Sequence, residues 1–346
     1  MKNTGGRHIL RITAYYVYLL SGILFFGIPN GGKETFSALI MYLLGTFSAY
    51  IAVNICVKVS CCGEEMPALL KGIFTIFGFF ICCALFGTYS LEFADFVASI
   101  SKDYGGARFS RFFVLAVILL ALYMGKRREV SFCRSCMLFL PVVILPYIIT
   151  WFAFLGYKAE VSDLQPVFSL AVYPDYFAKG FGNAAGIFIL ARALKNNGEY
   201  KEEKAETAVA FVLFSVTCIL ETAKYILWYG ASGLSYILRP DMTMLACVPF
   251  MNVQEIFIFS YFFAFAVRAC VFCTCARHFA ENISAEKIIP PWVYYSGSAC
   301  ILYTFHTAFS EFPVEEWKLI TAFFAGIILY YVPQKIKKTH KTSRKA

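Results

Sequence analysis

The chain has 346 residues, of which 59% are hydrophobic, 18% aromatic and only 15% charged. Soluble globular proteins contain about 45 to 50% apolar and about 25% charged residues, so this composition excludes a soluble domain and indicates a polytopic membrane protein. The net charge of +9 is, in such a protein, more often an orientation signal than a nucleic-acid footprint. The 13 cysteines are odd in number and many cluster inside apolar runs, so they predict no disulfide framework.

Apolar runs long enough to cross a bilayer, about 20 residues each, recur along the whole chain. The ten predicted spans are 9–28, 36–59, 72–98, 109–125, 137–156, 176–194, 205–229, 255–279, 291–309 and 316–333. The sixth is short and rich in small residues. The sequence therefore predicts an all-α, single-domain bundle over residues 1–346, with a basic tail at 334–346.

The distribution of Lys and Arg predicts the orientation of these spans, because cytoplasmic loops retain positive charge. Of the 31 Lys and Arg residues, 21 lie on both termini and the even-numbered connections, 8 lie on the odd-numbered connections, and Lys224 and Arg268 lie within spans. Both termini are therefore predicted to be cytoplasmic. The first apolar run has no small-residue cleavage site, so we expect the first helix to be retained.

Two connections on the predicted outer side, 157–175 and 230–254, are long and semi-apolar and contain prolines. They lie along the membrane surface or fold back over a cavity, or else they form ordinary interfacial loops. Their tyrosines and phenylalanines suit the membrane interface in both cases.

Signals for catalysis are few. Cys133-x-x-Cys136 has the spacing of a zinc or redox pair, but no second pair or histidine pair accompanies it in the same cytoplasmic connection. It also follows the basic segment 126–128, which repels a cation. His306 in the ninth span is more typical of a helix contact than of a proton relay. No hydrolase, metalloprotease or nucleotide-binding motif occurs in the sequence. We expect neither an enzyme nor a metal or cofactor site.

Ionisable residues within predicted spans are better candidates, because a charge at membrane depth is costly and usually faces a partner or a wet cavity. Arg268 lies near the midplane of the eighth span and has no evident acidic neighbour on its own helix face, which favours a functional role. Glu221 and Lys224 are three residues apart on the seventh span, and a structural ion pair is the favoured interpretation. Glu92 and Asp95, near the outer end of the third span, can reach the interface.

Glycines interrupt two spans at matching positions if the ten spans form two sets of five. Residues 21–32, at the end of the first span and just after it, contain four glycines and Pro29, and residues 180–186 of the sixth contain three glycines. Broken segments at corresponding places indicate a transporter-type solute site, because unwound backbone exposes N–H and C=O groups. The alternatives are close helix packing or, around Pro29, a plain turn.

The chain resembles the spore germination permease family, the integral-membrane B subunit of spore germinant receptors. The resemblance rests on ten spans with cytoplasmic ends, on glycine followed by Pro29 in the first helix, and on the segments 164–168, 239–245 and 252–257. It departs from the family at Ile256, where an arginine is common.

The resemblance implies membership of the amino acid-polyamine-organocation transporter superfamily, with a five-plus-five inverted repeat (9–156 and 176–333) and a solute pocket between the first and sixth helices. It also implies a sensor of nutrient germinants such as amino acids, located in the spore inner membrane. The implied partners are an A-type membrane subunit and a C-type lipoprotein of the same receptor.

The expected function is therefore non-enzymatic sensing of an amino acid at the two broken helices, with N–H groups of half-helix ends receiving its carboxylate. Arg268 supplies charge to this cavity or anchors the eighth helix beside it. The expected substrate-binding residues are Ser21, Gly22, Gly27, Gly182, Asn183, Gly186 and Arg268. The alternative is a secondary transporter of amino acids coupled to a cation, which the sequence alone does not separate from a sensor.

Overall fold

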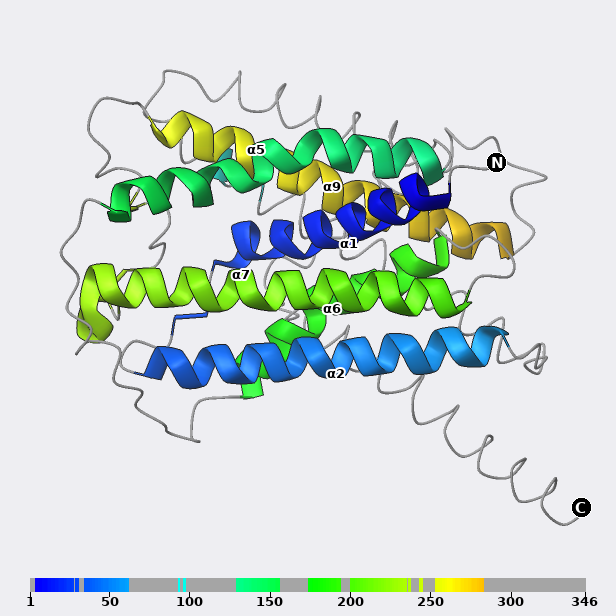
Figure 1. Ribbon diagram of the computed structural model, residues 1–346, viewed down its shortest axis with the longest axis horizontal. Coiled ribbons are helices and arrows are strands. Elements are labelled where there is room, and N and C mark those ends of the chain that lie inside the picture. The colour runs from blue at the N-terminus through cyan, green and yellow to red at the C-terminus, as the bar shows by residue number, and fades with distance from the viewer. Residues whose placement is uncertain are drawn as a thin grey trace, which may run out of the picture.

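The computed structural model describes residues 4–27, 29–30, 34–61, 93, 96–97, 129–155, 174–193, 200–234, 236–237, 243–244 and 253–282. This part of the chain is all-helical (Figure 1). Its helices are α1 (Thr4–Phe26), α2 (Thr35–Cys61), α5 (Glu129–Leu155), α6 (Pro174–Ala193), α7 (Tyr200–Leu234) and α9 (Val253–Asn282).

Six of the predicted spans coincide with these helices. The starts agree within a few residues except in α1, α5 and α7, which begin earlier than predicted, α5 by about two turns at Glu129. The spans predicted at 109–125, 291–309 and 316–333, most of 72–98, and the tail 334–346 lie outside the described residues. So do Glu92, Asp95, His306, the segment 164–168 and most of 239–245.

The described helices alternate in direction. In Figure 1, α1, α5 and α7 begin at the right-hand end of the bundle, whereas α2, α6 and α9 begin at the left-hand end. Hydrogen bonds join Asn30, which follows α1, to Tyr176 in the first turn of α6 and to Leu234 at the end of α7. Helices that cross the same layer one after another run in alternate directions, as these helices do.

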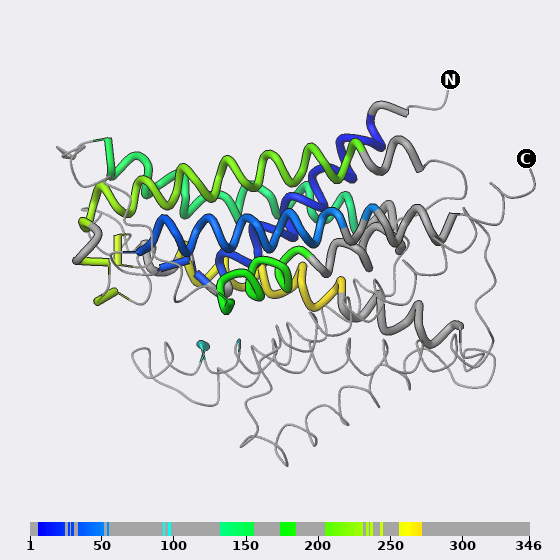
Figure 2. Tube along the Cα trace, turned by 90° about the horizontal axis from the view of Figure 1, so that it is seen from below, coloured from blue at the N-terminus to red at the C-terminus, as the bar shows by residue number. Residues whose placement is uncertain are grey.

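Helix α1 is the centre of the described bundle and contacts α5, α6, α7 and α9. From Ala14 to Leu24 nearly every side chain is buried, on all faces of the helix. A helix that is apolar all round is stable only when other helices surround it. Figure 2 shows α1 running between α7 and the layer of α6 and α9.

Two segments of the bundle are long and apolar enough to cross a membrane, Phe132–Leu155 of α5 and Ala205–Gly230 of α7. Much of their apolar surface faces outward, with Leu138 and Leu155 being 76% and 75% exposed. One face of α7 carries a continuous exposed stripe: Val209, Val212, Leu213, Val216, Ile219 and Leu220. Water disfavours such a surface, so these two helices favour insertion into a membrane.

Close helix approach at glycine explains part of the sixth span's composition. A Cβ on Gly180 of α6 would collide with the backbone carbonyl of Tyr42 on α2, and one on Gly45 of α2 would collide with that of Phe177. Thr46 Oγ1 also donates to the Gly180 carbonyl at 3.4 Å. Packing through small residues, one of the two interpretations of this segment, therefore holds at Gly180.

The predicted interruption of the sixth span is wrong, because α6 is continuous from Pro174 to Ala193. In the first span the helix does end at the predicted place. Gly27 adopts φ 74° and its N–H donates to the Ile23 carbonyl at 2.8 Å, which is a left-handed helix C-terminus that favours glycine. A second glycine of positive φ, Gly230 at 71°, kinks α7 and was not predicted.

Proline creates one further link between helices. Pro146 has no N–H, so the carbonyl of Val142 one turn earlier in α5 lacks its usual helical donor. Ser260 of α9 donates its hydroxyl to that carbonyl at 2.6 Å. The proline therefore directs a polar contact between α5 and α9 rather than merely bending α5.

Candidate functional site

Arg268 of α9 lies fully buried in the bundle beside α1 and α6. Its Nε donates to Ser21 Oγ at 3.0 Å, and its Nη2 donates to Asn183 Oδ1 and to the Tyr18 carbonyl at 3.5 Å. The guanidinium carbon lies 4.8 Å from the centre of the Tyr18 ring. The arginine is therefore held by two other helices and by one aromatic face.

Burial of a guanidinium is costly unless hydrogen bonds and favourable electrostatics replace its water. The oxygens of Ser21, Asn183 and Tyr18 supply the hydrogen bonds, and the Tyr18 ring supplies a cation–π contact, which strengthens when desolvated. The planar guanidinium of arginine suits this arrangement, because its N–H groups point in fixed directions, here toward α1 and α6.

Asn183 connects this arginine to α2. Its Nδ2 donates to Tyr42 Oη at 2.8 Å and to the Leu19 carbonyl at 3.2 Å. With both of these bonds formed by the amide nitrogen, the amide oxygen is left facing Arg268, which matches donors to acceptors. Asn183 therefore fixes the side of the amide that meets the cation.

Ser21 and Gly22 give α1 its part of the site. Ser21 Oγ donates to the Tyr18 carbonyl at 2.6 Å and accepts from Arg268. Gly22 is required for space, because a Cβ there would collide with the Asn183 amide and with the Arg268 guanidinium. The absence of a side chain at Gly22 is therefore what admits the guanidinium to α1.

Four of the seven predicted site residues meet in this cluster, namely Ser21, Gly22, Asn183 and Arg268. Gly182 is buried beside Asn183 in α6. Gly27 lies at the end of α1, where its N–H is already bonded within the helix. Gly186 is helical, and its surroundings lie outside the described residues.

The continuity of α6 corrects the chemistry expected at this site. N–H groups inside an unbroken helix bond to carbonyls one turn earlier, so Gly182 and Gly186 do not stand at a half-helix end. Side chains, above all Arg268, are the polar groups that the described site presents between α1 and α6.

Tyr18 and Tyr42 take part in the cluster and were not predicted. A signal for Tyr18 exists, because Tyr18, Ser21 and Gly22 stand at i, i+3 and i+4 and so share a helix face. Tyr42 has no such signal, since its partner Asn183 is 141 positions away.

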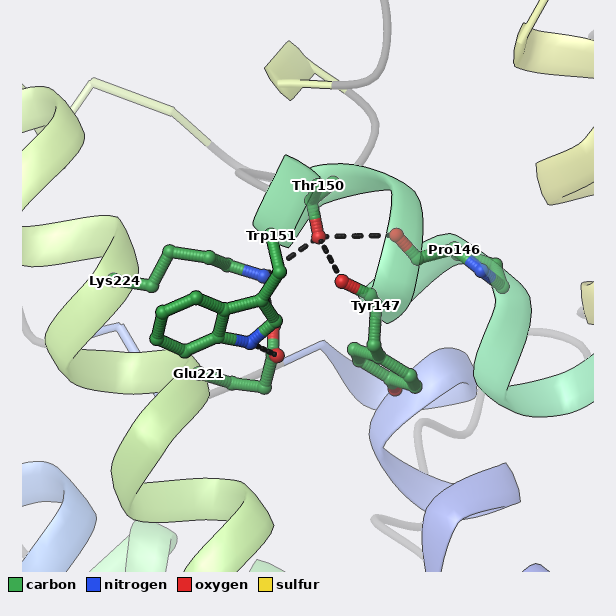
Figure 3. A network of polar contacts seen from close by, with 6 residues as sticks. All are labelled: Pro146, Tyr147, Thr150, Trp151, Glu221 and Lys224. Carbon is green, nitrogen blue, oxygen red and sulfur yellow. Dashed lines mark hydrogen bonds and ion pairs between the residues drawn. The ribbon is translucent and has the colours of Figure 1, made fainter. Parts of the chain in front are cut away.

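A second buried polar cluster lies between α5 and α7 (Figure 3). Lys224 Nζ pairs with Glu221 Oε2 on its own helix and donates to Thr150 Oγ1 of α5 at 2.6 Å. Trp151 Nε1 donates to Glu221 Oε1 at 2.6 Å. The predicted structural ion pair between Glu221 and Lys224 is confirmed.

Contacts between α1 and α7 recur at three levels along both helices. In the N-terminal parts of both helices Glu206 lies against His8 and Arg11, the latter at 3.6 Å. Midway, Tyr16 Oη lies 2.8 Å from Thr217 Oγ1. At the far end Asn30 Nδ2 donates to the carbonyls of Leu234 and Ile237 at 2.7 and 2.8 Å. The Asn30 side chain, directly after Pro29, thus caps the end of α7.

Cys133 and Cys136 are buried in α5, and Cys218 and Cys270 are buried in α7 and α9. Among the described residues, no group of three or more His, Cys, Asp or Glu side chains is arranged to hold a metal ion. The structure gives the described thiols a place in the packed interior, where cysteine behaves as a small apolar residue.

Comparison with known proteins identified no relative of this chain. No model of a known protein family matches the sequence, and no curated protein matches it significantly.

Proposed function

We propose that the chain is the membrane-embedded sensor subunit of a spore germinant receptor, of the spore germination permease family, and that it binds an amino acid to trigger germination. The proposal includes ten membrane helices in a five-plus-five inverted repeat, both termini in the cytoplasm, and location in the spore inner membrane. It also includes an A-type membrane subunit and a C-type lipoprotein as partners.

The observation that supports this proposal best is the cluster around Arg268. Ser21, Asn183 and Arg268, selected from three distant segments as solute-binding residues, lie within hydrogen-bonding reach of one another in the middle of the bundle. A buried guanidinium is the side chain best suited to a carboxylate, because it offers two parallel N–H donors. An amino acid is a small nutrient that carries this group.

The same cluster suggests how binding changes the protein. The guanidinium of Arg268 now bonds to Ser21 on α1 and Asn183 on α6, so a carboxylate has to replace one or both of these bonds. Replacement separates α9 from α1 or α6 and favours a second conformation. The ligand acts to the extent that its affinity for the two conformations differs.

Deletion of the gene is the direct test. Sporulation should remain intact while the response to at least one nutrient is lost, and an unchanged response to all germinants would contradict the proposal. Binding of amino acids to the purified chain, measured by calorimetry, should be lost in Arg268→Gln and kept in Arg134→Gln, since Arg134 is exposed on α5.

A second measurement separates the two candidate functions, sensing and transport. Uptake of labelled amino acid into proteoliposomes, with and without an ion gradient, distinguishes a sensor from a cation-coupled secondary transporter.

Cysteine accessibility tests the orientation, because the segment 126–134 should react only from the cytoplasmic side. Reaction from outside would overturn the proposed topology.

A further inference from the structure

The surroundings of the Lys224 ammonium group form a cage with contributions from two helices. A carboxylate oxygen of Glu221 and the hydroxyl of Thr150 contact the nitrogen. The centres of the Tyr225 and Trp151 rings lie 4.6 and 5.4 Å from it. Figure 3 shows the lysine chain reaching along the indole of Trp151 toward Thr150.

Other contacts hold the two α5 walls of this cage, Trp151 and Thr150, in place. Trp151 is fixed through its indole N–H, which donates to the second carboxylate oxygen of Glu221. Thr150 Oγ1 also bonds to the carbonyls of Pro146 and Tyr147 at 3.0 and 2.9 Å, which orients its oxygen in the first place. The walls are thus built by α5 and α7 independently of Lys224 itself.

We propose that the α5–α7 interface contains a binding site for a primary ammonium ion, formed by Glu221, Thr150, Trp151 and Tyr225, and that the native occupant is the chain's own Lys224. The cation at this interface is then part of the chain itself, and the site binds no cation from solution. This inference does not depend on the proposed sensing function.

The composition of the cage favours ammonium over a hard metal cation. The N–H donors of an ammonium group match the carboxylate and the hydroxyl, and aromatic faces bind organic cations well. Sodium and magnesium prefer shells made of several oxygens. The two rings occupy directions from which such oxygens would have to come.

Chemical rescue tests the inference. Lys224→Ala removes three methylene groups and the ammonium, which together equal n-propylammonium. We expect the variant to unfold at least about 5 °C below the wild type in detergent, because it leaves a buried carboxylate without its cation. Millimolar n-propylamine should restore at least half of that loss along a saturating curve, and the neutral amine can cross a detergent or lipid layer to reach the site.

The controls define what would overturn it. Equal recovery of stability with n-propanol would mean that the additive only fills an apolar cavity. Recovery with K⁺ or Na⁺ but not with propylammonium would assign the site to an alkali cation. Recovery with none of these additives would show that there is no ammonium site. Lys179→Ala is the matched control, because Lys179 stands 5.3 Å from the Tyr176 ring in a partly exposed position. It should respond to none of the additives. Lys224→Met, which keeps the side-chain length without the charge, should be destabilised as well; wild-type stability in Lys224→Met would contradict the proposal.

Discussion

Arg268 and Lys224 are both fully buried cations, yet they are satisfied in different ways. Lys224 pairs with Glu221, three residues away on the same helix, and adds one hydroxyl of α5. Arg268 directs its hydrogen bonds to α1 and α6, at residues 247 and 85 positions away. Both charges of the lysine cluster therefore lie on α7, whereas the arginine cluster exists only when three helices are assembled.

This difference has a functional consequence. A pair that carries both charges within one helix changes little when neighbouring helices move, so it suits a fixed part of the structure. A cation bonded through side chains of two other helices changes its partners whenever those helices shift. In the proposed sensor, the arginine cluster is therefore the place where ligand binding would be coupled to helix movement.

The largest effect on stability is expected from Glu221→Gln. The change leaves the Lys224 ammonium buried against a neutral amide, which should cost about 3 to 5 kcal/mol of unfolding free energy, as breaking a buried pair does. Thermal unfolding of the purified chain measures it. The double variant Glu221→Gln with Lys224→Met should be more stable than Glu221→Gln alone, and the reverse order would show that the pair is not what stabilises this interface.

The next effect concerns ligand response. Arg268→Gln should raise the amino acid concentration needed for half-maximal response by at least about tenfold, because a charge-assisted bidentate contact contributes more than about 1.4 kcal/mol. Arg268→Lys should recover only part of the response, since an ammonium lacks the planar fork that reaches Ser21 and Asn183. Wild-type sensitivity in both variants would place the ligand elsewhere.

Gly22→Ala tests whether space at α1 is limiting. A single Cβ there collides with the Asn183 amide and the Arg268 guanidinium, so overpacking should cost about 1 to 3 kcal/mol and reduce the response. Gly6→Ala is the matched control on the same helix, because a Cβ at Gly6 meets nothing within 4 Å. Equal behaviour of the two variants, judged by unfolding temperature and dose–response curves, would exclude a steric role for Gly22.

The smallest effect is expected from Tyr42→Phe. The substitution removes the hydroxyl that accepts from Asn183 Nδ2, so the amide keeps the Leu19 carbonyl as its remaining acceptor. One neutral hydrogen bond contributes about 1 kcal/mol. Denaturant unfolding should show that loss, and the ligand response should shift slightly because the Asn183 amide is less firmly oriented. A response that shifts more than in Arg268→Gln would reverse the assigned importance of these residues.

The fold was predictable wherever the signal lay in a continuous stretch of chain. Long apolar runs predicted the six described helices, and the Glu221–Lys224 pair followed from its i, i+3 spacing. The prediction that α6 is interrupted was wrong because glycine has two roles in helices. It can end a helix, or it can let two helices approach each other closely. At Gly180 the Tyr42 carbonyl stands where a side chain would be, which is a property of α2 and not of α6.

The sequence by itself determined that the chain is apolar and helical, where its helices lie, and which polar residues are buried with them, because hydrophobic periodicity and i, i+3 spacing act over a few residues. The tertiary structure decided which of these residues meet. That Ser21, Asn183 and Arg268 form one cluster, that Gly22 makes room for it, and that Asn30 caps α7 depend on helices far apart in the chain packing side by side. No local pattern contains that information, since the partners are fixed by the shapes of whole helix faces.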